Sequence, residues 1–135
     1  MRTIVIDGEK HVIDCNAFTP FVYSENFTTI RDGRKVSDDI AVAIKEIFDL
    51  IDTVGFPPLL RMMQLFWAFE KSARPQATPS FKDWLKSLPP LVVNLDDEDG
   101  WASEVMEEIR CSFFRNSSKA DVEAETEQTQ AATVS

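Results

Sequence analysis

Residues whose side chains could do chemistry are few in this sequence, and they do not form a familiar set. His11 is the only histidine, and Cys15 and Cys111 are the only cysteines. A zinc site usually needs four such ligands in closely spaced pairs, and an acid–base site needs a histidine with an orienting partner. The sequence therefore predicts that these three residues are structural, and it predicts no catalytic, metal or cofactor site.

The acidic run Asp96-Asp97-Glu98-Asp99-Gly100 is the one local pattern that resembles a metal-binding loop. If Gly100 takes the place of the invariant glycine of a calcium loop, Leu95 falls on the first ligand position and Met106 on the bidentate glutamate. Neither side chain supplies an oxygen ligand, so calcium binding is not expected. Negative charge here instead suits the N-terminus of a following helix.

The chain as a whole is acidic, with 23 Asp and Glu, 14 Lys and Arg, and a net charge of −9. This charge repels nucleic-acid phosphates and anionic membrane surfaces. No window approaches the roughly 18 apolar residues of a membrane span, and the N-terminus lacks the apolar stretch of a signal peptide. We therefore expect a cytoplasmic protein without direct contact to nucleic acid or membrane.

Apolar periodicity predicts the helices. In residues 38–54 large apolar side chains recur every three or four positions, and Ser37 is a candidate N-cap. Residues 58–73 have ten apolar positions, which predicts a helix that either lies at the centre of the fold or contacts a partner. Shorter helices are expected at 81–88, with Ser80 as the cap, and at 100–114. The predicted apolar face of the helix at 38–54 consists of Ile40, Ile44, Ile47, Ile51 and Val54. That of the helix at 100–114 consists of Trp101, Val105, Met106, Ile109 and Phe113.

The N-terminal third is expected to hold one hairpin, one short helix and one loop. Residues 3–6 and 11–13 are β-branched runs on either side of a turn that contains Asp7-Gly8, a dipeptide typical of tight hairpins. The arginine-rich segment 31–35 contains one glycine and predicts a loop that leads into the next helix. The short helix is expected to begin near Pro20, with Asn16 or Thr19 as its cap and Phe18, Phe21, Val22 and Phe27 as its anchors.

Together these elements predict a mainly α fold with a small N-terminal β-hairpin, in a compact bundle of four to five helices. Residues 1–115 are expected to form one domain, because a chain of this length has room for a single core. Residues 116–135 contain no aromatic residue and are rich in Glu, Ser, Thr, Gln and Ala. We expect them to be a disordered acidic tail.

Two groups of residues are candidates for binding a partner protein. Aromatic and methionine side chains on the apolar helix usually belong to a core, but they also line adaptable grooves for helical partners. Arg31 and Arg34, together with Lys35, are the one basic cluster, which is either a solvated loop or a docking point for an acidic partner segment. The candidates on the helix are Met62, Met63, Phe66, Trp67 and Phe69.

The order of these features resembles that of the tail assembly chaperones of long-tailed phages and prophages. The resemblance spans about residues 3–115 and rests on the Asp7-Gly8 hairpin, TPFVYSENF at 19–27, LLRMMQLFWAFEKSA at 59–73 and SFKDWL at 80–85. It implies a protein that binds the tape measure protein, keeps it soluble and assists assembly of the tail tube. It also implies the major tail tube protein as a second candidate partner, and absence from the mature virion.

Two other functions stay open on the sequence. The net charge of −9 would also suit an acidic inhibitor or nucleic-acid mimic that blocks a basic host protein, with binding that weakens as salt rises. The apolar helix would also suit a dimeric regulatory adaptor, and a homo-oligomer is compatible with the chaperone hypothesis. An enzyme is not expected, because no acid–base, nucleophile or metal set is present in the sequence.

Overall fold

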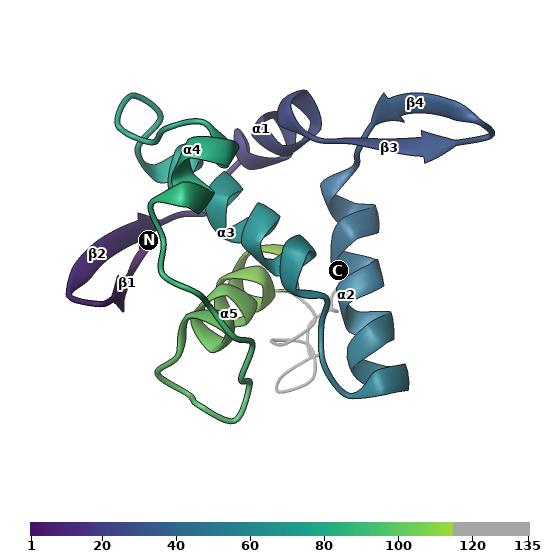
Figure 1. The fold of residues 1–135 in the computed structure, drawn as a ribbon. Coiled ribbons are helices and arrows are strands. Elements are labelled where there is room, and N and C mark those ends of the chain that lie inside the picture. The colour runs from purple at the N-terminus through teal and green to yellow at the C-terminus, as the bar shows by residue number, and fades with distance from the viewer. Residues whose placement is uncertain (115–135) are drawn as a thin grey trace, which may run out of the picture.

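Five helices and two small antiparallel sheets make up the part of the chain that the computed structural model describes, residues 1–114 (Figure 1). The predicted mainly α fold with an N-terminal hairpin is confirmed. The tail predicted at 116–135 lies outside the described residues. The elements in chain order are β1 (Arg2–Ile6), β2 (Glu9–Ile13), α1 (Thr19–Asn26), β3 (Thr28–Arg31), β4 (Arg34–Ser37), α2 (Ile40–Val54), α3 (Leu59–Ala73), α4 (Phe81–Lys86) and α5 (Trp101–Phe113).

The hairpin of β1 and β2 has the tight turn that the sequence predicted. Asp7 and Gly8 have φ values of 51° and 80°, the positive values that a type I′ turn requires at both central positions. Because side chains alternate along a strand, one face of the hairpin is buried and packs on α3 and α5. That face consists of Ile4, Ile6, His11 and Ile13.

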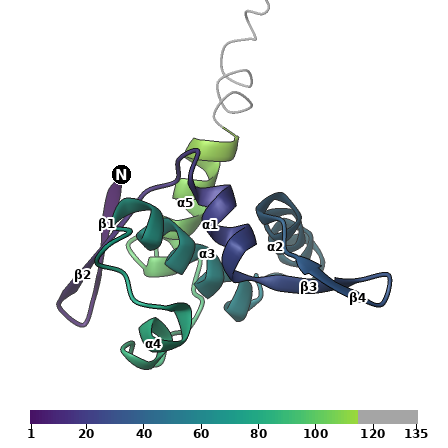
Figure 2. The same ribbon diagram turned by 90° about the horizontal axis from the view of Figure 1, so that it is seen from above.

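Helix α3 is the central element of the fold. It contacts β2, α1, α2, α4 and α5, and Figures 1 and 2 show these elements arranged around it. The core beside it is aromatic: the ring of Phe66 lies 5.1 Å from that of Trp84 and 5.7 Å from that of Trp101. Aromatic rings in such edge-on or stacked contacts add stability beyond the apolar area that they bury. The central position predicted for this helix is therefore confirmed.

A sharp break separates α2 from α3. Gly55, with φ 93°, ends α2, and its N–H donates to the carbonyl oxygens of Leu50 and Ile51. Glycine adopts this left-handed conformation more readily than other residues because it has no Cβ atom, which favours the end of the helix at this position. Helix α2 begins two residues later than predicted, because Asp39 is its N-cap and accepts a hydrogen bond from the Ala41 N–H at 2.8 Å.

Residues 28–37 form a second hairpin, so the loop predicted at Arg31–Lys35 was wrong. Asp32 and Gly33 have φ values of 54° and 75° and make the same kind of turn as Asp7 and Gly8. At its base the Asp38 N–H donates to the Phe27 carbonyl oxygen at 2.9 Å. The hairpin projects away from the helices (Figures 1 and 2), and we call it the β3–β4 arm.

Helix α1 is anchored by a different set of rings from the one predicted. Val22 and Phe27 are buried, as expected. Phe18 and Phe21, however, are 45% and 57% exposed and stack on each other at 5.9 Å, so the prediction was wrong for these two. Tyr23 is fully buried instead, because it lies on the side of α1 that packs against α3.

The last two helices agree closely with the sequence. Ser80 caps α4 and accepts a hydrogen bond from the Asp83 N–H at 3.3 Å. Trp101, Val105, Met106 and Ile109 of α5 are buried as predicted, whereas Phe113, at the end of the helix, is 36% exposed, so the prediction was wrong for this residue. Within residues 1–114 no helix combines the length and apolar character that crossing a membrane requires.

Candidate partner-binding site

The side chains of α3 that were candidates for partner binding lie in the core. Met62, Phe66, Trp67 and Phe69 are at most 1% exposed, and Met63 is half-buried. Of the two interpretations that the sequence allowed, these four residues follow the core one. A partner that binds this folded form cannot reach these four side chains. A contact surface must therefore be formed by other residues, which are exposed.

The side chain of Trp67 shows that these residues make their contacts within the domain. Its ring lies edge-on to Phe27 at 5.6 Å and to Phe81 at 5.9 Å. Its Nε1–H donates to the Pro79 carbonyl oxygen at 2.9 Å, which satisfies the one polar atom of the side chain. Both the apolar ring and its N–H are therefore occupied by the chain itself.

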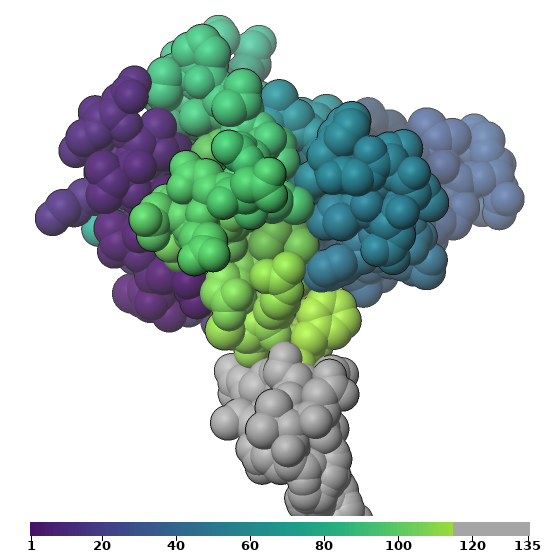
Figure 3. Space-filling model, turned by 90° about the horizontal axis from the view of Figure 1, so that it is seen from below, coloured from purple at the N-terminus to yellow at the C-terminus, as the bar shows by residue number. Residues whose placement is uncertain are grey.

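Large apolar side chains are instead exposed where α2 ends and α3 begins. Val54, Phe56, Leu59 and Leu60 are 54%, 61%, 42% and 57% exposed. These four residues lie close together in the chain, around the break between the last turn of α2 and the first turn of α3. Figure 3 shows this teal segment at the surface, to one side of α5. We call these four residues the apolar corner.

Charged residues of α2 border the apolar corner. Glu46 pairs with Arg61 at 2.9 Å, and Asp49 pairs with Lys45 at 2.7 Å. Asp52 is exposed and forms no ion pair with any described residue. An apolar centre with polar residues around it is the usual composition of a protein-binding surface.

The arginines predicted as a second binding group lie on the β3–β4 arm. Arg31 and Arg34 are exposed and are direct cross-strand neighbours beside the turn. Within residues 1–114 neither side chain forms a hydrogen bond or an ion pair. The structure therefore keeps the arm and the apolar corner as separate surfaces, contributed by different elements.

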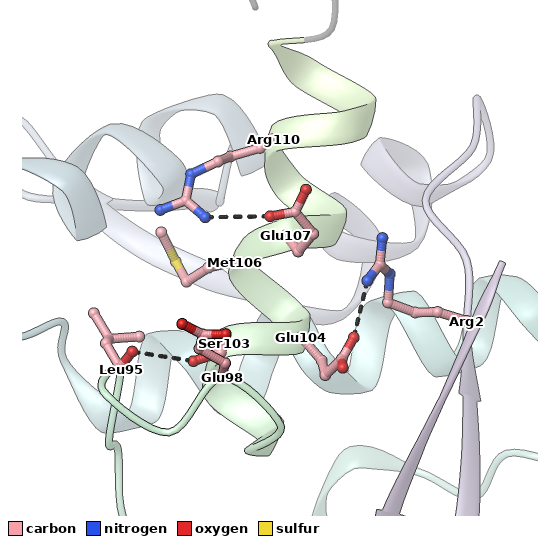
Figure 4. Close-up of a pocket in the computed structure, with 8 residues that line it drawn as sticks. All are labelled: Arg2, Leu95, Glu98, Ser103, Glu104, Met106, Glu107 and Arg110. Atoms are coloured by element: carbon pink, nitrogen blue, oxygen red, sulfur yellow. Dashed lines mark hydrogen bonds and ion pairs between the residues drawn. The ribbon is translucent and has the colours of Figure 1, made fainter.

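A pocket of about 360 Å³ lies along α5 (Figure 4). Its charged groups are largely neutralised by one another: Arg2 lies 2.8 Å from Glu104, and Arg110 lies 3.6 Å from Glu107. Small-molecule sites are mostly apolar with a few converging polar groups, which this open hollow is not. Among the described residues no group of three or more His, Cys, Asp or Glu side chains could hold a metal ion.

His11 is buried and belongs to a polar cluster in the core. Its Nδ1 lies 2.9 Å from Glu70 Oε1, which also accepts a hydrogen bond from Trp84 Nε1 at 3.1 Å. The hydrogen bond to Glu70 raises the pKa of His11, although burial opposes this. His11 Nε2 is buried and has no hydrogen-bond partner in the described part of the chain. This environment agrees with the packing role predicted for the histidine.

Two further buried carboxylates are held by arginines. Asp38 accepts a hydrogen bond from Arg61, which also donates to the Tyr23 hydroxyl at 2.9 Å. Glu108 accepts from Arg2 at 2.9 Å and from the Cys15 backbone N–H at 3.0 Å. Burial raises the pKa of Cys15 to about 11 and that of Tyr23 to about 12. A thiol with such a pKa is protonated near neutral pH and is a poor nucleophile.

No protein-family model, curated protein or solved structure matches this chain. The resemblance to tail assembly chaperones thus rests on the residues and motifs alone.

The apolar corner could have been inferred from the sequence, but the apolar spacing of the two helices led to the assignment of its residues to the core. Val54 was assigned to the buried face of α2 because it continues the apolar spacing, and that assignment was wrong. Phe56 lies in the break between the helices. Leu59 and Leu60 are the first residues of α3, and they share the apolar character that predicts the core of that helix. Four large apolar residues around Gly55 and the two prolines could have indicated an exposed cluster, because a turn between helices lies at the surface.

Proposed function

We propose that this protein is a tail assembly chaperone that holds an apolar stripe of the helical tape measure protein on its apolar corner. The observation that carries the proposal is the group of four large apolar side chains, each at least 42% exposed, on a domain with a complete core of its own. Clustered exposed apolar side chains often mark a protein-binding site. The name of the partner comes from the resemblance of the sequence to the chaperone family.

The apolar character of the corner suits an amphipathic helical partner. An amphipathic helix presents apolar side chains every three or four residues, and it can lie across the ends of two helices that meet at a turn. Burial of apolar surface contributes about 25 cal/mol per Å² before the costs of association, so one corner gives modest affinity. A long helix with repeated apolar stripes can bind many copies, and the net charge of −9 keeps the coated assembly soluble.

The corner supports this function better than charge supports an inhibitor or a nucleic-acid mimic. A mimic needs its carboxylates available to a basic partner. Several carboxylates are instead engaged within the domain, including Asp38 with Arg61 and both Glu104 and Glu108 with Arg2. The four side chains of the apolar corner, by contrast, are at least 42% exposed.

Co-expression with the tape measure protein of the same phage or prophage tests the proposal. We expect the full chain to keep that protein soluble and to co-purify with it, and the double variant Phe56→Ser/Leu60→Ser to lose both effects. The matched control is Phe21→Ser/Val92→Ser, which removes a phenylalanine and an aliphatic residue that are 57% and 76% exposed elsewhere. The control should behave like the wild type.

Three outcomes would count against this function. Aggregation of the tape measure protein despite the wild-type chain would reject the chaperone role. Equal loss of binding in both double variants would show that exposed apolar area in general, and not the corner, is responsible. A purified protein that is dimeric, and becomes monomeric only in Phe56→Ser/Leu60→Ser, would assign the corner to a second copy and favour the adaptor.

A further inference from the structure

The β3–β4 arm is a prominent feature of the fold that the proposed function does not use. None of its eight strand residues is buried, and only Thr29 and Val36 are half-buried. Figures 1 and 2 show it extending from the body beside α2. A two-stranded hairpin without a packed face is only marginally stable in water, so the arm adds little to the core.

The tip of the arm has an arrangement of charge that costs stability. Arg31 and Arg34 are cross-strand partners, which places both guanidinium groups on the same face. Like charges directly opposite one another destabilise a hairpin. Neither guanidinium group forms an ion pair or a hydrogen bond with any residue in 1–114, whereas those of Arg2 and Arg61 are both held by buried carboxylates. The two guanidinium groups are thus available to an anionic ligand.

The net negative charge of the chain limits which kind of anionic ligand can bind to the arm. Adjacent guanidinium groups bind carboxylate or phosphate oxygens through several charge-assisted hydrogen bonds. A nucleic acid would bring a continuous line of phosphates toward a chain with net charge −9, which is unfavourable beyond the arm. A short acidic stretch of polypeptide can place its carboxylates on the arm alone. Charge complementarity therefore favours an acidic peptide.

The backbone of the arm indicates the conformation of that peptide. Because the sheet has only two strands among residues 1–114, each strand has one edge with no described strand beside it. An extended segment can add to such an edge by main-chain hydrogen bonds, with alternate side chains on one face. Lys35 and Ile30, the latter 69% exposed, form the cross-strand pair on the opposite face. That face offers an apolar contact and a single cation.

We propose that the β3–β4 arm binds an extended acidic segment of a partner protein, whose carboxylates on one face meet Arg31 and Arg34. The backbone of the segment continues the sheet at one edge of the arm. This inference goes beyond the proposed function, because it does not involve the apolar corner. Either surface can fail its test without affecting the other.

An NMR titration of the full, isotope-labelled chain tests the inference. The probe is a peptide of alternating glutamate and threonine, and its control is the same peptide with glutamine in place of glutamate. We expect the acidic probe to shift the amide signals of residues 28–37 selectively, and its affinity to fall as salt rises. In Arg31→Gln/Arg34→Gln the affinity should fall by about tenfold or more, as for the loss of charge-assisted hydrogen bonds.

Lys82→Gln/Lys86→Gln is the matched control, since it removes two exposed cations of α4 and changes the net charge equally. It should bind the acidic probe like the wild type. Equal weakening in both variants would overturn the inference, as would tighter binding of a single-stranded oligonucleotide of the same charge. Binding that appears only after Asp121, Glu123, Glu125 and Glu127 are changed to amides would make the chain's own acidic segment the occupant and would also overturn it.

Discussion

The Nδ1 atom of His11 lies 2.9 Å from the Oε1 atom of Glu70, and this contact joins β2 to the central helix α3. Glu70 Oε1 also accepts the Trp84 Nε1–H at 3.1 Å, so α4 is tied to the same oxygen. The His11 side chain is only 6% exposed, and its ring lies edge-on to Phe66 at 5.7 Å. A single carboxylate therefore links three elements that are distant in sequence.

Protonation of His11 should make stability depend on pH. The pKa of His11 in the fold is raised above the ordinary value of 6.5, mainly by its hydrogen bond to Glu70, with Glu9 and Arg74 acting in opposite directions. Its contribution is therefore fully present below about pH 6.5 and is lost as pH rises through the folded-state pKa. Urea unfolding should show that the difference in free energy of unfolding between wild type and His11→Gln shrinks from about pH 6 to about pH 9. A difference that stays constant over this range would contradict the coupling.

The variants Phe66→Ala and Phe56→Ala should differ in stability, because Phe66 lies in the core and Phe56 in the apolar corner. Phe66 is 0% exposed, and its loss leaves a cavity, so we expect the free energy of unfolding to fall by about 3–5 kcal/mol. Phe56 is 61% exposed, and its loss should change stability by no more than about 0.5 kcal/mol. Urea or thermal unfolding of both variants gives the comparison. Similar losses would mean that the corner is part of the cooperative core.

Removal of the Arg61 guanidinium should be far more harmful than removal of a surface cation. In Arg61→Met the carboxylate of Asp38, which is 2% exposed, loses its charged partner, and breaking such a pair costs about 3–5 kcal/mol. Lys45→Met breaks the exposed Lys45–Asp49 pair and should cost about 0.3–0.5 kcal/mol. Denaturant unfolding compares the two. The buried pair contributes little if Arg61→Met lowers the free energy of unfolding only slightly and the double variant Asp38→Asn/Arg61→Met lowers it no further.

The two glycine turns should respond differently to alanine. Gly8 and Gly33 have φ values of 80° and 75°, so an alanine is strained at either position by about 1–2 kcal/mol. The β1–β2 hairpin is part of the core, and Gly8→Ala should lower global stability by that amount. In Gly33→Ala only the arm should open, because it has no buried strand residue. Hydrogen exchange should then quicken at the amides of residues 28–37 alone. Equal effects on global stability would show that the arm folds cooperatively with the body.

Local chemistry predicted the elements of this fold where one signal dominated. The apolar spacing of α2 and α5, the capping Ser80 and the Asp7-Gly8 turn each identified an element. The arm was missed although Asp32-Gly33 repeats that turn between runs rich in Thr, Ile and Val, because clustered charge was interpreted as a loop. Helix α2 is capped by Asp39 and not by Ser37, because Ser37 is the last residue of β4.

The sequence by itself determined the helices, the first hairpin, the acidic balance and the expectation of one core, because these depend on near neighbours and on composition. The tertiary structure alone decided which apolar residues are exposed. Met62, Phe66, Trp67 and Phe69 are enclosed because α3 is surrounded by other elements, whereas Val54, Phe56, Leu59 and Leu60 stay exposed because no element within residues 1–114 covers these four side chains. A hydropathy pattern assigns both groups the same apolar character. Only the packing of distant elements separates core from surface.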